Sequence, residues 1–223
     1  MATASLSIDL DAIAYNLDVM RQRAGGVKVC GVVKANAYGH GMIEVARKLE
    51  EAGVDYLGVA DVAEALELRR AGIDAPILAW LHDPHEMFVE AVNEGIELGL
   101  ANEDHLARVA AAAEITGRLA RVHLKVDTGL NRNGASAAEW EGVLRQARAL
   151  VAEGFIQVVG IFSHLSSTGE AEDLAQIARF DAAVEIARES GLQFELRHLT
   201  ASDGSLNYPQ AQYEMVRVGV ALY

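Results

Sequence analysis

The chain has 223 residues, of which 51% are hydrophobic, so it can bury a sizeable core. A formal net charge of −13 argues against binding to nucleic acid or to anionic membranes and favours a small-molecule partner. The single cysteine, Cys30, excludes an intrachain disulfide, favours a cytoplasmic location and is expected to be a core residue. No secretory signal is expected, and no apolar run approaches the ~20 residues of a membrane helix.

Short apolar segments alternate with amphipathic helical patterns along the chain. An opening helix is predicted over residues 7–26, where a pair of glycines ends it. The connection over residues 202–213 is only weakly helical in pattern. The apolar segments predict strands at residues 27–33, 56–60, 75–81, 96–101, 120–127, 155–162, 196–200 and 214–218.

Eight strands separated by helices within this length predict an α/β fold, a (β/α)8 TIM-type barrel. A doubly wound sheet is the second possibility. No linker or low-complexity stretch divides the chain, so residues 1–223 are expected to form one barrel domain. The sequence stops at GVALY, where an eighth helix would follow, and the barrel is therefore predicted to be truncated after its eighth strand.

Polar residues gather at the predicted carboxyl ends of the strands, where a barrel of this kind has its active site. Taken singly, each has an ordinary explanation, such as a lysine that flanks a strand, a turn aspartate or a core histidine. Taken together, they bring several mutually repelling cations to one end of the barrel, and a bound anion would offset that repulsion. The residues are Lys34, Lys125, Asp127, Asn131, Arg132, His164, Ser202, Asp203, Gly204, Arg217 and Gly219.

The residue types at this end favour a phosphate-bearing cofactor. Ser202, Gly204 and Gly219 follow strands seven and eight, where barrels commonly bind phosphate through hydroxyls and backbone N–H groups. A desolvated lysine beside other cations is neutral often enough to form a Schiff base. Together these features suggest pyridoxal 5'-phosphate (PLP), and a phosphosugar aldolase, which uses many of the same parts, stays open as an alternative. No metal site is predicted.

Five segments of the chain resemble motifs of the alanine racemases. They are VVKANAYGHG (32–41), KVDTGLNRNG (125–134), FSHLSS (162–167), RHLTAS (197–202) and MVRVGVALY (215–223). The resemblance covers essentially the whole chain in order and spacing. It implies a fold-type III PLP-dependent isomerase that interconverts L-alanine and D-alanine, supplies D-alanine for peptidoglycan synthesis, and is a homodimer at full length.

The resemblance also implies roles for individual residues. Lys34 would hold PLP as a Schiff base and act as one of two catalytic bases. His164 would line the pyridine ring. The phosphate would be bound by four groups, which are the side chains of Tyr38 and Ser202 and the backbone N–H groups of Gly219 and Val220.

Arginine and lysine residues would complete the site that the resemblance implies. Arg132 would contact the cofactor oxygen and the substrate carboxylate, and Lys125, carbamylated in many family members, would orient Arg132. Arg217 would face the pyridine nitrogen. Since an arginine in a protein does not give up its proton, it can only donate a hydrogen bond there, which leaves the ring unprotonated and favours racemisation.

The sequence departs from the family in two places. Where the family usually reads Asn-Ser, this chain has Ala201-Ser202, and Asp203 adds a carboxylate near the predicted phosphate site. The family's C-terminal β domain is absent from this chain; its tyrosine provides the second base of the partner subunit, a role that Tyr223 cannot fill. Two alternatives therefore stay open, which are a single-domain PLP-binding protein and a racemase of another amino acid, such as serine or lysine.

Overall fold

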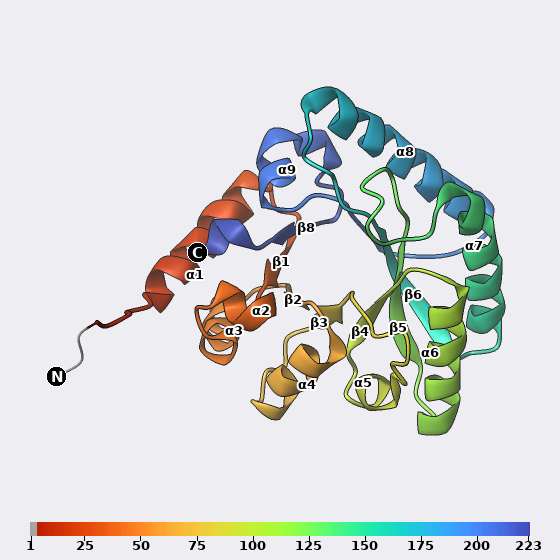
Figure 1. Cartoon of the computed structure of the whole chain (residues 1–223), viewed down its shortest axis with the longest axis horizontal. Coiled ribbons are helices and arrows are strands. Elements are labelled where there is room, and N and C mark those ends of the chain that lie inside the picture. The colour runs from red at the N-terminus through yellow and green to blue at the C-terminus, as the bar shows by residue number, and fades with distance from the viewer. Residues whose placement is uncertain (1–3) are drawn as a thin grey trace.

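The computed structural model describes residues 4–223, so the first three residues of the predicted domain lie outside the described residues. Parallel strands in this range form one sheet that curls into a nearly closed barrel, and helices lie around its outside (Figure 1). The strand order is β7-β6-β5-β4-β3-β2-β1-β8. Because this order follows the chain without the reversal of a doubly wound sheet, the predicted (β/α)8 barrel is confirmed and the second possibility is wrong.

Every strand of the barrel lies inside its predicted range. The strands are short and buried, as expected for a parallel sheet that is covered on its outer face by helices. They are β1 (Lys28–Val32), β2 (Tyr56–Val59), β3 (Ile77–Ala79), β4 (Glu97–Leu100), β5 (Ala120–Lys125), β6 (Ile156–Phe162), β7 (Leu196–His198) and β8 (Met215–Val218).

Several helices begin at polar residues that cap their first turn, although the longest, α8 (Glu170–Glu189), begins after Gly169 without a side-chain cap. The Asp9 carboxylate accepts from the N–H groups of Asp11 and Ala12, and the Glu139 carboxylate accepts from the N–H of Ser136 in a capping box. The helices are α1 (Leu10–Arg23), α2 (Lys34–Tyr38), α3 (Met42–Glu51), α4 (Val62–Arg70), α5 (Val89–Asn93), α6 (Glu103–Thr116), α7 (Ala137–Ala152), α8 (Glu170–Glu189) and α9 (Ser202–Asn207), with 3-10 turns η1 (Pro209–Ala211) and η2 (Val220–Leu222).

Helix α1 lies beside the segment that follows β8. It packs against β1, α3 and η2, and Figure 1 shows it alongside the end of β8. The Asn16 side chain donates to the carbonyl of Leu222 over 3.0 Å, and the Gln212 side chain donates to the carbonyl of Arg23. The segment that precedes the first strand therefore packs over that strand and over the turn that follows the last one.

The seam between β7 and β8 is closed by side chains. Within residues 4–223, no strand ladder joins these two strands. The Glu214 carboxylate accepts from the backbone N–H of Arg197 at 2.8 Å and also pairs with its guanidinium. Further along, the backbone N–H of Arg217 donates to the carbonyl of Thr200 at 3.0 Å. The barrel thus closes at the point where one of the predicted site residues lies.

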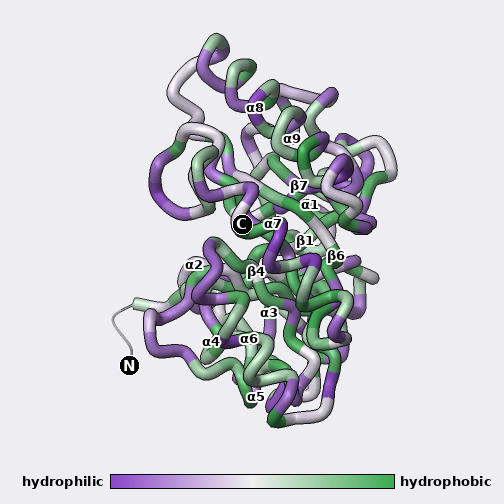
Figure 2. Tube along the Cα trace, turned by 90° about the vertical axis from the view of Figure 1, so that its right-hand side faces the viewer, coloured by the Kyte–Doolittle hydropathy of each residue, from purple (hydrophilic) through white to green (hydrophobic). Residues whose placement is uncertain are grey.

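The core has one layer between helices and sheet and another inside the barrel. Figure 2 shows hydrophobic segments through the middle of the molecule and polar segments toward its periphery. Cys30 lies in the inner cluster at 0% exposure, and burial raises the pKa of its thiol to about 12, which confirms it as a core residue. In the described part of the chain, no helix is long and apolar enough to cross a bilayer.

Candidate active site

Most of the residues predicted to gather at the carboxyl end of the barrel line one cavity there, whereas Asp127, Asn131 and Gly204 do not. The cavity has a volume of about 860 Å³. Such a volume suits a small-molecule cofactor or substrate. Apolar residues from β6 and from the loops, among them Trp80 and Phe162, form part of its wall. The predicted residues on it are Lys34, Tyr38, Lys125, Arg132, His164, Ser202, Arg217, Gly219 and Val220.

Lys34 is followed by a turn of left-handed helix. Ala35, Asn36 and Ala37 have φ of 52°, 55° and 52°, and Tyr38 has φ of 53°. Each non-glycine residue in this region costs about 1–2 kcal/mol, and asparagine less. The turn returns the chain so that the Lys34 ammonium lies 5.9 Å from the centre of the Tyr38 ring. The sequence analysis did not predict this conformation.

Side chains from two other segments hold the turn in place. The Glu64 carboxylate accepts from the N–H groups of both Ala35 and Ala60, at 2.7 and 2.8 Å. Tyr223 donates its hydroxyl to the carbonyl of Val32 at 2.9 Å, and its ring stacks on His40. Sequence reasoning gave neither Glu64 nor Tyr223 a role in placing Lys34, because both lie far from it in the sequence.

Glycine at position 35 is expected to stabilise the protein. Ala35 is exposed and left-handed, so Ala35→Gly removes backbone strain without opening a cavity, and the free energy of unfolding should rise by about 0.5–1 kcal/mol. The matched control is Ala182→Gly at an exposed position inside α8, which should lower it by about 1 kcal/mol. Urea unfolding measures both values, and an equal loss in the two variants would contradict the left-handed turn.

Cations converge on the cavity and lower one another's pKa values. Burial, together with Arg132 and Arg217, lowers the pKa of Lys34. Burial and the same two arginines lower the pKa of Lys125 to about 7 and that of His164 to about 3. At neutral pH, His164 is therefore neutral and Lys125 is partly so. Both pKa values fall because burial and the neighbouring positive charges each destabilise the charged form of the side chain.

The low pKa of Lys125 predicts a dependence of stability on pH. An unfolded lysine titrates near 10.4, so between about pH 7 and 10 the unfolded chain binds more protons at this position than the folded chain. The contribution of Lys125 to the free energy of unfolding therefore rises with pH across this window. Lys125→Met should be more stable than the parent at pH 6, by roughly 2–4 kcal/mol, and the difference should shrink toward pH 10.

Denaturant unfolding at several pH values measures this difference. The control is Lys28→Met at the exposed start of β1, on the opposite end of the barrel, which removes a lysine that lies outside the cation cluster. A Lys125→Met variant that is less stable than the parent at pH 6 would contradict the low pKa.

Hydrogen bonds to residues at the ends of β6 and β7 hold the Arg217 side chain, and one of its donors remains available to the cavity. Its Nη1 donates to Nδ1 and to the carbonyl of His198, both at 2.9 Å, and its Nη2 donates to the carbonyls of Ser163 and Leu199. These bonds account for four of the five N–H groups of an arginine. In the described part of the chain, the Nε–H has no protein acceptor. A ligand in the cavity could accept from it.

Arg217 stays protonated at neutral pH. Burial lowers its pKa only to about 10, so the guanidinium remains a cation that cannot accept a hydrogen bond. Nη2 also lies 3.2 Å from Nδ1 of His164. The arginine therefore joins the cation cluster as a fixed donor at the floor of the cavity.

A second part of the cavity is lined by hydroxyl and backbone N–H groups. The Ser202 hydroxyl oxygen accepts from the N–H groups of Gly219 and Ala221 at 3.1 and 3.2 Å. A Cβ on Gly219 would collide with the Tyr38 hydroxyl, so glycine is needed there. Asp203 also lines the cavity, but its carboxylate accepts from the Asn207 side chain along α9. The donors at this end suit a phosphate group.

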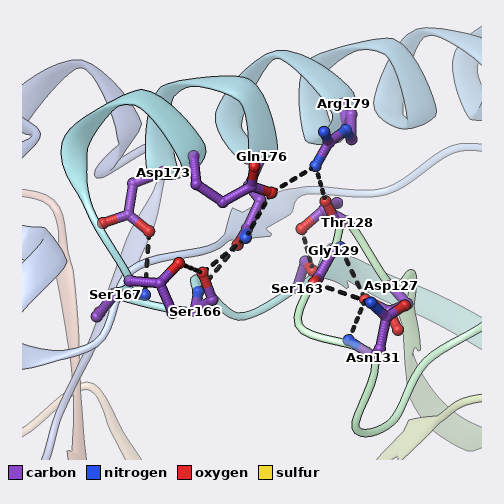
Figure 3. A network of polar contacts seen from close by, with 12 residues as sticks. Asp127, Thr128, Gly129, Asn131, Ser163, Ser166, Ser167, Asp173, Gln176 and Arg179 are labelled. Atoms are coloured by element: carbon purple, nitrogen blue, oxygen red, sulfur yellow. Dashed lines mark hydrogen bonds and ion pairs between the residues drawn. The ribbon is translucent and has the colours of Figure 1, made fainter.

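The loop that carries Arg132 is braced from α8 (Figure 3). The Asp127 carboxylate accepts from the N–H groups of Gly129 and Asn131, which makes it a turn residue. Arg179 of α8 donates to the carbonyl of Thr128 at 3.0 Å. Helix α8 therefore fixes the base of this loop.

Gln176 extends the same bracing to the loop after β6. Its side chain accepts from the N–H of Ser166 at 2.9 Å and donates to the Ser166 hydroxyl at 2.7 Å. The hydroxyls of Thr128 and Ser163 lie 2.9 Å apart and join the two loops directly. Figure 3 shows these side chains between α8 and the two loops. One loop follows Lys125 at the end of β5, and the other follows β6 and contains His164.

Comparison with known proteins agrees with the motifs and with the barrel. The sequence profile of the family described as "Alanine racemase, N-terminal domain" matches residues 8–223. The chain belongs to this family. The expected resemblance to alanine racemases is thereby confirmed, and the aldolase alternative is wrong.

Individual relatives of the alanine racemase family match along the whole chain. The alanine racemase of Thermobifida fusca (strain YX) is 44% identical over 223 residues, which cover 99% of this chain and 60% of the relative. That of Mycolicibacterium smegmatis is 44% identical and is covered over 58% of its length. The crystal structure of alanine racemase from D-cycloserine producing Streptomyces lavendulae has a TM-score of 0.95 at 40% identity, over 97% of this chain and 57% of that one. This chain spans about 60% of the length of such relatives.

Proposed function

We propose that the chain is the cofactor-binding barrel of a PLP-dependent racemase that interconverts L-alanine and D-alanine. The observation that carries the proposal is the placement of Lys34 and of the free Nε–H of Arg217 on one cavity. Family membership supports the reaction and the substrate. The cytoplasm is the proposed location, as the single buried cysteine favours.

The residues on the cavity fit PLP. The hydroxyls of Tyr38 and Ser202 and the N–H groups of Gly219 and Val220 would hold the phosphate, with the Gly219 N–H turning to it from the Ser202 hydroxyl. Arg217 would donate its Nε–H to the pyridine nitrogen. When bound, PLP supplies an aldehyde that links to an amine and a ring that acidifies the α-carbon of an amino acid. Phe162 and His164 supply ring surfaces on the wall.

Lys34 is the proposed base for one face of the substrate. Its lowered pKa, caused first by burial and then by Arg132, lets the amine release its proton more readily than an exposed lysine does. Arg217 does not give up its proton, so it would only donate a hydrogen bond to the pyridine nitrogen, which would stay unprotonated and leave the electron sink weak. Such a site favours removal and return of the α-proton over side reactions.

Arg132 and Lys125 are the proposed substrate-binding pair. Arg132 lies on the cavity and would bind the substrate carboxylate. The pKa of Lys125, near 7, makes its amine nucleophilic at neutral pH, and carbamylation would replace a cation with an anion beside Arg132. That exchange would relieve part of the repulsion among the cations and orient Arg132.

A second base must serve the opposite face of the substrate. Removing a proton from one face and returning one to the other needs two groups that flank the same carbon. We propose that the other group is a tyrosine from the C-terminal domain of a partner subunit, in a homodimer of the full-length protein. The length of the relatives, of which the chain spans about 60%, leaves room for such a domain.

Reduction and peptide mapping test the proposal. The chain mixed with PLP is expected to absorb visible light, and borohydride treatment should fix the pyridoxyl group on Lys34, whose amine lies on the cavity with a lowered pKa. Mass spectrometry of tryptic peptides identifies the labelled lysine. Exposed Lys28 serves as an internal control that should stay unlabelled at stoichiometric PLP. Labelling of Lys125 in place of Lys34 would contradict the assignment.

A further inference from the structure

A line of buried polar side chains crosses the barrel interior from Arg217 to the opposite end. Nδ1 of His198 lies 2.9 Å from Nη1 of Arg217, and Nε2 of His198 lies 2.9 Å from Nδ1 of His123. Nε2 of His123 lies 2.7 Å from a carboxylate oxygen of Glu97. None of these four residues is more than 5% exposed. His123 and Glu97 do not line the cavity and have no role in the function proposed above.

The partners at the two ends fix where every proton in this line lies. Arginine can only donate, so Nδ1 of His198 must accept and its Nε2 must carry the hydrogen. That Nε2–H donates to Nδ1 of His123, which leaves the hydrogen of His123 on Nε2, where it donates to Glu97. The hydrogen bonds therefore run in one direction, from Arg217 to Glu97, through two neutral imidazoles.

Neither histidine can move its ring hydrogen to its other nitrogen without pointing two hydrogen-bond donors at each other. A hydrogen on Nδ1 of His123 would face the Nε2–H of His198. Moving that hydrogen to Nδ1 of His198 would place it against Nη1 of Arg217. In a buried site such a clash costs the hydrogen bond and leaves polar groups without partners.

Position 97 requires a carboxylate in this arrangement. One oxygen of Glu97 accepts from His123, and the other accepts from Nε of Arg121 at 2.7 Å. A glutamine has one acceptor oxygen and one donor amide, so it satisfies only one of the two neighbours. The Glu97 carboxylate therefore fixes the direction of the hydrogen bonds from the end of the line that lies farthest from the cavity.

The sheet is locally adapted to bring the two histidines together. The register of β5 against β6 shifts between Val122 and His123, which makes a bulge on β6 that leads into Gly160. A Cβ at Gly160 would lie 2.8 Å from Nδ1 of His123 and 2.8 Å from the carbonyl of Leu196. Any larger residue would push on the contact between the two rings.

We infer that Glu97 and His123 are positioning residues that lock His198 in its Nε2–H tautomer and thereby hold Arg217 with its Nε–H free for the cavity. The value of that free donor to the enzyme rests on the proposed function, whereas the tautomers do not. The two parts can therefore be tested separately.

Nitrogen NMR of the chain without cofactor tests the tautomers directly. Two-bond proton–nitrogen spectra of the ¹⁵N-labelled imidazoles, assigned with single histidine variants, are expected to show neutral Nε2–H rings for both His123 and His198 at neutral pH. This measurement needs no activity and no change at Glu97. A ring hydrogen on Nδ1 of either histidine would overturn the inference.

Replacing Glu97 tests the link to the cavity. Glu97→Gln should disturb both tautomers and weaken the binding of PLP, measured by its absorbance, by roughly tenfold, which is the loss of about one hydrogen bond. Glu195→Gln, at an exposed carboxylate just before β7, is the matched control and should change neither. Unchanged tautomers and unchanged PLP binding in a folded Glu97→Gln variant would overturn the inference.

A double variant supplies a rescue. With Arg121→Gln added, the glutamine at 97 no longer faces a competing arginine and can turn its oxygen to His123, so the tautomers and most of the PLP binding should return. Failure of this rescue in a folded double variant would overturn the argument for position 97. If the unmodified chain binds no PLP, the proposed function fails, and the nitrogen spectra still decide the tautomers.

Discussion

Replacing Lys34 with alanine is expected to slow the exchange of the α-proton of alanine, catalysed by this chain with PLP, by about 10²- to 10⁴-fold. Lys34 is the amine that the left-handed turn presents to the cavity, and its lowered pKa suits a base. Incubation in deuterated buffer, followed by proton NMR of each alanine enantiomer separately, measures the exchange. Because Lys34 is proposed to serve only one face of the substrate, the unmodified chain should exchange one enantiomer much faster than the other.

Lys28→Ala is the control for this experiment. Lys28 begins the same strand at the other end of the barrel and is exposed, so its loss should leave the exchange rate unchanged. Equal exchange of both enantiomers by the unmodified chain would contradict the two-base proposal. A Lys34→Ala rate within a few-fold of the parent would show that another group removes the proton.

Arg217→Gln is expected to change both the outcome of the reaction and the stability of the barrel. Since Arg217 is the proposed cationic donor to the pyridine nitrogen, its loss should lower the ratio of proton exchange to transamination by about tenfold or more. The carbonyls of Ser163 and Leu199 would lose buried donors, so the free energy of unfolding should fall by about 2–4 kcal/mol. Pyruvate formation, alanine deuteration and urea unfolding give the three values.

A neighbouring arginine separates the two effects. Arg197→Gln breaks the pair with Glu214 at the seam but does not touch the cavity. It should lower stability and leave the ratio of exchange to transamination unchanged. An unchanged ratio in Arg217→Gln as well would mean that Arg217 does not face the pyridine nitrogen.

The fold was predictable because its signals repeat. Short apolar segments alternate regularly with amphipathic helical patterns, and each strand lies inside its predicted range, from β1 to β8. The ends of the strands also carried the site, since a parallel barrel gathers them at one rim. Lys34, Lys125 and Arg217 could therefore be brought together from spacing and from the family resemblance alone.

The parts of the site that were missed depend on three-dimensional register. Only Asn36 in the segment after Lys34 has a preference for left-handed backbone, so the turn leaves almost no trace in the sequence. Glu97 and His123 lie in strands, and the alternation of side chains along a strand predicts which of them point into the barrel. It does not predict at what level along the barrel axis each side chain meets those of the other strands. Their contact depends on the shear of the barrel and on the bulge opposite His123, neither of which a single sequence displays.

The seam between β7 and β8 constrains how this barrel can evolve. Arg217 joins these strands through the carbonyls of Leu199 and His198, so the residue proposed to face the pyridine nitrogen also holds the wall of the barrel together. A lineage that exchanged it for a carboxylate, to reach a different reaction, would first have to acquire another closure for the same gap. A substitution of Arg217 would therefore affect both the reaction type and the closure of the barrel. A neutral evolutionary route to a different reaction would have to begin with a change at the seam.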